Sequence, residues 1–349
     1  MDNKVIKVGS FFSGIGAPEK ALNRLKHEKV IDDFEVKFFS EIDINAVKSY
    51  CAIHDISEDL NLGDIVNIKG TNLPYCDLWV GGFPCQDISV AGKMKGFDFD
   101  SRTRSSLGWE MIRLLKEIKE KPKYIIFENV AAITCKKYKN TLDLFKQDLE
   151  NLGYNLYDDL LCATDFEIPQ TRTRYFLVAK LDHKIFKFPS KKKSNIKLYQ
   201  FIDNKVDDAY YLTKKGYIKV NNNIVYLKKK NENYIRYKVH LNKYYNGGIC
   251  GEDLYCKFEI SKKLFSPYKY CPTLTASNTG NNAKIVLVET DNIEIRKLTE
   301  KECWRLMGFD DSDFEKAKNV CFKTNLYHQA GNSIVVNVIY SVLRELFAS

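Results

Sequence analysis

The pattern that decides the fold is Val5-Ile6-Lys7-Val8-Gly9-Ser10-Phe11-Phe12-Ser13-Gly14-Ile15-Gly16-Ala17. Its first eight residues are mostly apolar or β-branched and predict a strand over 5–12. A turn with two glycines follows, and Pro18 lies near the first turn of a predicted helix with one apolar face, formed by Ala17, Ala21, Leu22 and Leu25. A glycine-rich turn after a first strand lets a cofactor approach the backbone. Many tight strand-to-helix turns have the same composition, so this turn alone does not identify a site.

The alternation of strand and helix continues through the first 180 residues. Further strands are predicted over 36–39, 78–80, 124–127 and 175–179, and helices over 45–53, 104–120 and 141–152. This order predicts an α/β fold with a mostly parallel, doubly wound, Rossmann-like sheet. Ligands of such sheets bind beyond the carboxyl ends of the strands. We therefore expect Gly14, Glu41, Pro84-Cys85 and Glu128, which all follow strands, to meet at one edge.

Length and composition limit the class of protein. The 349 residues, with a mass of 40.4 kDa, fit one large domain and a smaller one. No run of 18 apolar residues and no apolar signal core occur, so we expect neither a spanning helix nor export. The ten cysteines contain no Cys-x-x-Cys pair, which argues against a disulfide scaffold or a zinc site. We expect a cytoplasmic protein with free thiols and no metal.

Positive charge is concentrated in the middle of the chain. Residues 181–290 carry 21 Lys and Arg against 9 Asp and Glu, a net charge of +12, whereas the whole chain carries +9. Two lysine triplets, 191–193 and 228–230, lie among tyrosines. A solvated surface explains either triplet alone, but the asymmetry favours a surface for nucleic acid.

The fold of 184–295 cannot be assigned from the sequence. Helices are predicted again over 299–307, with Thr299 and Glu302 as a capping box, and over 333–346.

The most specific local motif is Gly81-Gly82-Phe83-Pro84-Cys85-Gln86. Most cysteines are small buried hydrophobes, but Cys85 follows a proline and is predicted at the mouth of a parallel sheet, a position suited to a nucleophile. The polar, glycine-containing stretch 89–97 downstream could close as a lid.

Four further residues carry candidate chemistry, each with a simpler alternative. Glu128 ends a hydrophobic strand, where desolvation would raise its pKa and favour a protonated donor; a carboxylate bonded to nearby backbone is the alternative. Arg172 and Arg174 share one face of an extended chain and suit an anion or a base carbonyl, or form a surface pair. Glu41 has the position of a ribose-hydroxyl acceptor, or is a solvated carboxylate. Asp64, in Gly63-Asp64-Ile65, could accept from an adenine amino group, or is a turn residue.

Taken in series, these motifs resemble those of the DNA (cytosine-5) methyltransferases. The matching set is Phe12-Ser13-Gly14-Ile15-Gly16, Glu41, Gly63-Asp64-Ile65, Phe83-Pro84-Cys85-Gln86, Glu128-Asn129-Val130, Gln170-x-Arg172-x-Arg174, Arg296-Lys297-Leu298-Thr299 through Arg305-Leu306-Met307-Gly308-Phe309, and Gly331-Asn332-Ser333. Single motifs are weak, but their order and spacing agree across nearly the whole chain. The exception is roughly 184–290, which in this family is the target-recognition region.

The resemblance implies an S-adenosylmethionine-dependent methyltransferase domain over residues 1–183 plus 320–349, and a smaller target-recognition domain over 184–319. It implies that Cys85, Glu128, Arg172 and Arg174 are catalytic. It assigns the cofactor to Phe12, Gly14, Gly16, Glu41, Ile42, Asp64, Ile65, Pro84, Asn332 and Ser333, with Pro84 also beside the target base. Two residues depart from the family pattern. Ala17 replaces a frequent glycine, and Ile42 replaces a large aromatic residue that packs against adenine.

The implied reaction explains why these groups are needed. A thiolate from Cys85 adds to cytosine C6, which makes C5 able to attack the sulfonium methyl group. A thiol of pKa about 8.5 needs a positive or dipolar setting to ionise, and the two arginines could supply it. Protonated Glu128 would donate to N3, and an arginine would stabilise O2. Since this geometry does not exist inside a duplex, the cytosine must be flipped out.

The implied partner is double-stranded DNA, with a cognate restriction endonuclease as a further partner unless the enzyme is an orphan or phage methyltransferase; we expect a monomer. Three alternatives stay open: a tRNA-methylating relative, an inactive DNA-binding protein of this fold, and a Rossmann oxidoreductase. Asn72-Leu73-Pro74-Tyr75 is similar to the Asn-Pro-Pro-Tyr signature of amino-group methyltransferases. Leu73 breaks that signature, and the cysteine motif favours carbon as the methyl acceptor.

Overall fold

The structure, a computed structural model, consists of two compact units. It describes residues 5–84, 104–182, 184–192, 194–211, 218–221, 224–228, 234–238, 264–265, 267–276, 284–289 and 292–348. The first unit comprises residues 1–162, 173–192 and 333–349, and the second comprises 163–172 and 193–332. Within the second unit, residues 170–171 pair with 271–272, and the helices between 300 and 332 pack on one another. The expected domain boundaries at 183/184 and 319/320 stay predictions.

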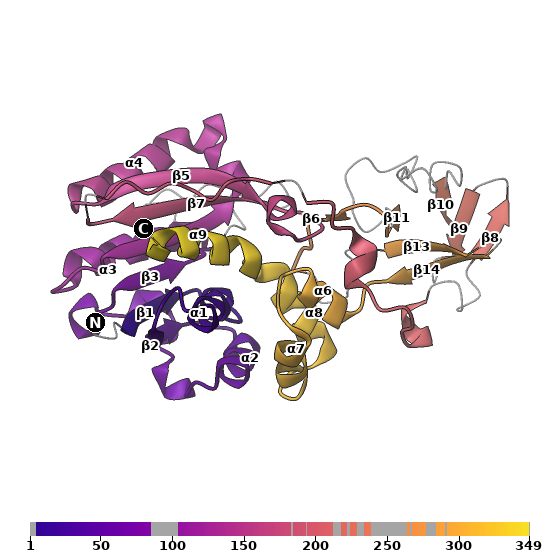
Figure 1. The fold of residues 1–349 in the computed structure, drawn as a ribbon, viewed down its shortest axis with the longest axis horizontal. Coiled ribbons are helices and arrows are strands. Elements are labelled where there is room, and N and C mark those ends of the chain that lie inside the picture. The colour runs from indigo at the N-terminus through magenta and orange to yellow at the C-terminus, as the bar shows by residue number, and fades with distance from the viewer. Residues whose placement is uncertain are drawn as a thin grey trace. The chain divides into compact units, whose positions relative to one another are not determined.

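The first unit is built on a six-stranded sheet with the strand order β2-β1-β3-β4-β7-β5 (Figure 1). The strands are β1 (Val5–Phe11), β2 (Asp33–Ser40), β3 (Leu78–Gly81), β4 (Tyr124–Val130), β5 (Asn155–Cys162) and β7 (Thr173–Lys180). The predicted parallel arrangement is confirmed for β2, β1, β3 and β4, whereas β7 lies antiparallel between β4 and β5. Strand β5 was not predicted, because its Asp158-Asp159 pair interrupts the apolar pattern of an edge strand.

Helices cover both faces of this sheet. They are α1 (Ala17–His27), α2 (Ile44–His54), α3 (Gly108–Glu117), α4 (Lys139–Asn151) and α9 (Val336–Ala348). Neighbouring residues of a strand point to opposite faces. Accordingly, Phe38 of β2 packs with Phe11 and Trp79 in the core cluster that α3 and α4 complete, whereas Phe39 stacks on Tyr50 of α2. The doubly wound α/β fold is therefore confirmed.

The last helix joins the first in one layer. Helix α9 packs against α1 (Figure 1), and the Arg24 guanidinium donates to the Asn337 side chain at 3.0 Å. It starts three residues later than predicted, because residues 323–332 form a separate helix, α8. Among the described residues, no helix is long and apolar enough to cross a membrane.

The second unit contains small sheets followed by helices. Its strands are β6 (Gln170–Thr171), β8 (Ile218–Asn221), β9 (Ile224–Lys228), β10 (Tyr234–Lys238), β11 (Leu264–Phe265), β12 (Cys271–Pro272), β13 (Lys284–Glu289) and β14 (Asn292–Lys297), and its helices are α6 (Glu300–Arg305), α7 (Asp311–Lys318) and α8 (Lys323–Asn332). The predicted capping box of Thr299 and Glu302 is confirmed. Part of the basic segment, including Lys193, Lys229 and Lys230, lies outside the described residues.

Candidate active site

The glycine-rich loop after β1 adopts a backbone that most residues avoid. Phe12, Gly14 and Gly16 have φ angles of 52°, 56° and 78°, in the left-handed region. The backbone N–H of Gly14 donates to the Glu41 carboxylate at 2.8 Å, and the N–H of Ser13 donates to the Ser40 carbonyl at 3.2 Å. The loop after β1 and the end of β2 therefore meet at one edge of the sheet, as the strand order predicted.

Glu41 is held by backbone donors on both sides. Its second carboxylate oxygen accepts the N–H groups of Ile42 and Asp43, each at 2.9 Å. Asn61 is a further residue of this group, which was not predicted from the sequence; its side-chain oxygen accepts the N–H groups of Glu41 and Gly63, each at 3.1 Å. The order Asn61-x-Gly63 is the signal that could have identified it, because asparagine often accepts from the N–H two residues later.

Glu41 and Asp64 lie beside uncrowded backbone. Asp64 accepts the Val66 N–H at 3.2 Å and starts a short 3-10 helix, Ile65–Asn67, in which Ile65 is buried. Ile42, the residue after Glu41, is 73% exposed, so its apolar side chain is open to solvent. A Cβ placed on Gly14 or Gly63 would meet no atom within 4 Å, so both backbones border open space. No cluster of three or more metal-ligating side chains occurs within the described part of the chain.

A second group of side chains lies at the ends of β3 and β4. Arg174 Nε of β7 is 3.2 Å from Glu128 Oε1 of β4, and both side chains are largely buried. A Cβ on Gly82 would lie 3.3 Å from Glu128 Oε2, and the Asn129 amide donates to the Phe83 carbonyl at 3.1 Å. The chain that leads into Cys85 thus starts against Glu128. Pro84 is half-buried; Cys85 and the predicted lid lie outside the described residues.

The two arginines of the Gln170-x-Arg172-x-Arg174 motif have different surroundings. Arg172 belongs to the second unit, is 4% exposed, and donates to the carbonyls of Leu274 at 2.8 Å and Gly331 at 3.0 Å. Arg174 belongs to the first unit and faces Glu128. The expectation that both arginines share one face toward a ligand treated residues 170–174 as one strand, but β6 ends at Thr171 and β7 begins at Thr173.

Asn332 and Ser333 straddle the division between the units. Asn332 ends α8, is exposed, and its amide nitrogen lies 3.4 Å from the His328 ring. Ser333 is 7% exposed, and its hydroxyl donates to the Ile334 carbonyl at 2.9 Å. Their assignment to the cofactor stays a prediction.

A buried polar group lies behind the glycine-rich loop. Glu19, in the first turn of α1, and Tyr50 of α2 are both 0% exposed. Burial raises the pKa of the Glu19 carboxyl, and interactions with its own backbone N–H and with the Ser10 and Tyr50 hydroxyls oppose the increase. Burial also raises the pKa of Tyr50, and the neighbouring Glu19 adds to that shift. Neutral forms of both groups are thereby favoured.

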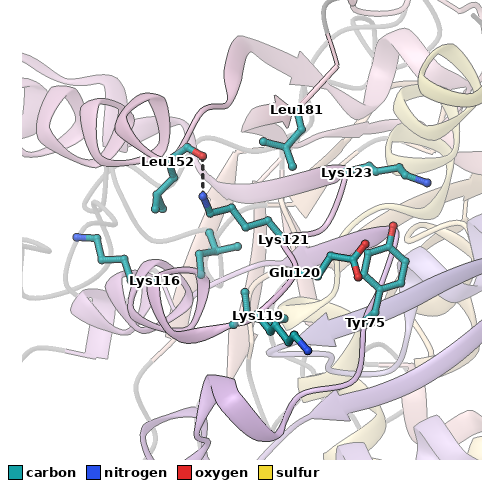
Figure 2. A pocket seen from close by; sticks show the side chains of 10 residues that line it. Tyr75, Lys116, Lys119, Glu120, Lys121, Lys123, Leu152 and Leu181 are labelled. Carbon is teal, nitrogen blue, oxygen red and sulfur yellow. Dashed lines mark hydrogen bonds between the residues drawn. The ribbon is translucent and has the colours of Figure 1, made fainter.

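A cavity of about 720 Å³ lies in a different part of the first unit (Figure 2). It is lined by Tyr75, Leu115, Lys116, Ile118, Lys119, Glu120, Lys121, Lys123, Leu152 and Leu181. Tyr75 precedes β3 and Lys123 precedes β4, so the cavity lies at the amino ends of these parallel strands. Lys121 donates to the Leu152 carbonyl at 3.1 Å, and Lys123 pairs with Asp77 at 3.0 Å. No predicted site residue lines this cavity, which separates it from the edge described above.

Comparison with known proteins agrees with this geometry. The family model "C-5 cytosine-specific DNA methylase" matches residues 6–348. The chain is 37% identical to the type II methyltransferase M2.ScrFI of Lactococcus lactis subsp. cremoris, over 83% of this chain and 71% of that protein. It is 31% identical to the orphan methyltransferase M.SPRI of Bacillus phage SPR, over 98% of this chain and 97% of that protein.

Its fold is similar to that of the Entamoeba histolytica methyltransferase EhMeth, with a TM-score of 0.70, 21% identity and coverage of 99% and 98% of the two chains. The fold described above is thus shared with a distant methyltransferase. Since the family model spans nearly every residue, the chain belongs to the C-5 cytosine-specific DNA methylases.

Proposed function

We propose that the chain methylates C5 of a flipped-out cytosine within a specific DNA sequence, through a covalent bond between Cys85 and C6. Membership of the family establishes DNA cytosine-5 methyltransferase activity. The observation that carries the finer mechanism is the Glu128–Arg174 pair, at 3.2 Å, next to Gly82 and the chain that leads to Cys85. A carboxyl group and a guanidinium held together at a sheet edge can bind two adjacent polar atoms of one ring.

The loop 12–16, Glu41 and the Asp64-Ile65 turn are proposed to hold S-adenosylmethionine. When bound, S-adenosylmethionine supplies an electrophilic methyl group. Glu41 offers acceptor oxygens suited to ribose hydroxyls, and Asp64 offers one suited to an amino group. Gly14 and Gly63 leave their backbones open to close approach, since a Cβ there would meet no atom within 4 Å. Phe12, Ile42, Ile65 and Pro84 would contribute apolar contacts, and Asn332 and Ser333 would close the pocket.

Cys85 and the Glu128–Arg174 pair would then activate the cytosine. The Cys85 thiolate forms a bond to C6 as the C5–C6 double bond opens, and negative charge develops on N3 and O2 of the ring. Glu128 in its protonated form donates its O–H to N3, and the Arg174 guanidinium donates to O2, so the charge is stabilised as it forms; one such donor contributes about 3–4 kcal/mol. After C5 gains the methyl group, its proton leaves to water, the C6–S bond breaks and the thiolate is regenerated.

In this proposal Arg172 does not touch the base. Both of its terminal nitrogens donate to carbonyl groups of the second unit, so its charge is used to hold backbone segments together. Arg174 is the arginine of the motif that faces the reacting groups.

Bisulfite sequencing of random duplex DNA after incubation with the enzyme and S-adenosylmethionine tests the activity and gives the sequence context. A duplex with 5-fluorocytosine tests the covalent step, because fluorine cannot leave as the proton does and the adduct persists. We expect a cross-link at Cys85 that Cys85→Ala abolishes. A parent enzyme that methylates DNA without ever forming this cross-link would disprove the covalent mechanism.

We also propose that the protein is a cytoplasmic monomer and that the basic second unit reads double-stranded DNA. Relatives include both type II and orphan methyltransferases, so a cognate endonuclease is a partner only in the first case. Labelled methyl groups offered with tRNA and duplex DNA in parallel distinguish the tRNA-methylating alternative. Incorporation into tRNA alone would contradict the proposed substrate.

A further inference from the structure

The glycine-rich loop needs support from outside its own residues. Three of its five residues, Phe12, Gly14 and Gly16, have left-handed φ angles, and Phe12 carries a side chain that disfavours this region. Such a backbone persists only where surrounding contacts determine it. One anchor is Glu41, just after β2, whose carboxylate accepts the Gly14 N–H at 2.8 Å.

His54 holds the loop at a second point. Nε2 of His54, the last residue of α2, lies 3.0 Å from the Ile15 carbonyl oxygen. A carbonyl oxygen only accepts, so the ring must carry its proton on Nε2 and donate it. The segment 33–55 therefore holds the loop twice, with a carboxylate at the end of β2 and with an imidazole at the end of α2.

The position of His54 is itself fixed by packing. Its ring centroid is 4.9 Å from that of Tyr50, and Tyr50 stacks on Phe39 with centroids 4.3 Å apart and ring planes 20° apart. Tyr50 and Phe39 are both 0% exposed. A row of three rings thus connects β2 to the Ile15 carbonyl.

The His54 ring lies so close to the loop that a residue larger than glycine would overlap with it at position 16. A Cβ on Gly16 would lie 2.0 Å from His54 Nε2 and 3.0 Å from Tyr50 Cδ2. Gly16 is therefore required for two reasons: its φ of 78° and the approach of the imidazole.

We propose that His54 is a positioning residue for the methyl donor. By donating to the Ile15 carbonyl, it holds the Gly14–Gly16 turn in the conformation that leaves Gly14 against Glu41 and its backbone open to the ligand. This inference rests on the proposed role of the loop as the S-adenosylmethionine site. A residue that only stabilised the fold would change the melting temperature without changing ligand affinity selectively.

The test compares His54→Ala and His54→Gln with the parent enzyme. A glutamine can place an N–H near the position of Nε2, whereas alanine cannot. Calorimetric titration with S-adenosylmethionine should give a dissociation constant about tenfold higher for His54→Ala, as expected for the loss of one hydrogen bond that orders the site, and near the parent value for His54→Gln. His27→Ala, at the exposed end of α1, is the matched control and should bind as the parent does. Affinity for DNA should not change in any of the three variants.

Two measurements on the ligand-free protein test whether His54 holds the loop, independently of S-adenosylmethionine binding. Hydrogen exchange of a peptide that covers residues 12–16 should be faster in His54→Ala than in His54→Gln. In addition, Gly16→Ala should destabilise the protein less in the His54→Ala background, because the overlap with the ring is gone. If the parent does not bind S-adenosylmethionine, the proposed function of the loop fails, while these two measurements still decide whether His54 holds it. Unchanged ligand affinity and unchanged exchange in His54→Ala would overturn the inference.

Discussion

The two arginines of the Gln170-x-Arg172-x-Arg174 motif offer a direct test, because one substitution should have opposite consequences at positions two residues apart. Arg172→Lys replaces two guanidinium donors, which reach Leu274 and Gly331 at 2.8 and 3.0 Å, with a single ammonium group. Arg174→Lys keeps a positive charge near Glu128 but removes the planar pair of donors.

The magnitudes follow from these contacts. A lysine at 172 can reach one of the two carbonyls, so one charged hydrogen bond is lost, and the free energy of unfolding should fall by about 1.5–3 kcal/mol. A lysine at 174 keeps a positive charge beside Glu128, so stability should change much less than for Arg172→Lys. Loss of a donor to the charge on cytosine O2 should lower kcat by about 10²–10³-fold. Urea unfolding followed by fluorescence and incorporation of labelled methyl groups into duplex DNA measure the two effects.

The reverse pattern would refute these roles of Arg172 and Arg174. If Arg174→Lys lost stability and kept its kcat, the pair with Glu128 would be structural. If Arg172→Lys unfolded like the parent but lost methyl transfer, Arg172 would reach the reacting base in a conformation different from the one described. Arg344→Lys, on the exposed side of α9, is the control for arginine replacement itself.

Three further perturbations have expected outcomes. Burial raises the pKa of Glu19, so the folded protein keeps a proton that the unfolded chain releases, and stability falls as pH rises above about 4.5. Glu19→Gln should therefore raise the melting temperature more at pH 8 than at pH 5. An equal shift at both pH values would contradict this. Glu302→Ala should lower the free energy of unfolding by about 3–5 kcal/mol, because the fully buried Arg296 loses two hydrogen bonds of 2.7 and 2.8 Å. A small effect in urea unfolding would show that this buried ion pair contributes little to stability. Glu41→Gln should weaken S-adenosylmethionine binding about tenfold or more by calorimetry, since an amide nitrogen would face a backbone N–H; unchanged affinity would remove Glu41 from the site.

Much of the fold could be predicted because its signals are local. The apolar strand before Gly14, the helix after it and the capping box at Thr299 each depend on residues within one or two turns of the chain. Strand β5 escaped prediction because an edge strand needs only one apolar face and tolerates Asp158 and Asp159 on the other. The second unit escaped it because short strands depend on partners far along the chain, as in the pairing of Cys271 with Gln170.

The sequence by itself determined which residues reach the carboxyl edge of the sheet. Parallel strands with helical crossovers leave no other place for Gly14, Glu41 and Glu128, because the chain order and the handedness of the crossovers fix the edge. Only the tertiary structure decided how these residues are supported and which neighbour each one faces. The hydrogen bonds of Arg172 span 102 and 159 residues, and that of His54 spans 39. Contacts at such separations arise from the packing of whole elements, and no local pattern of residues specifies them.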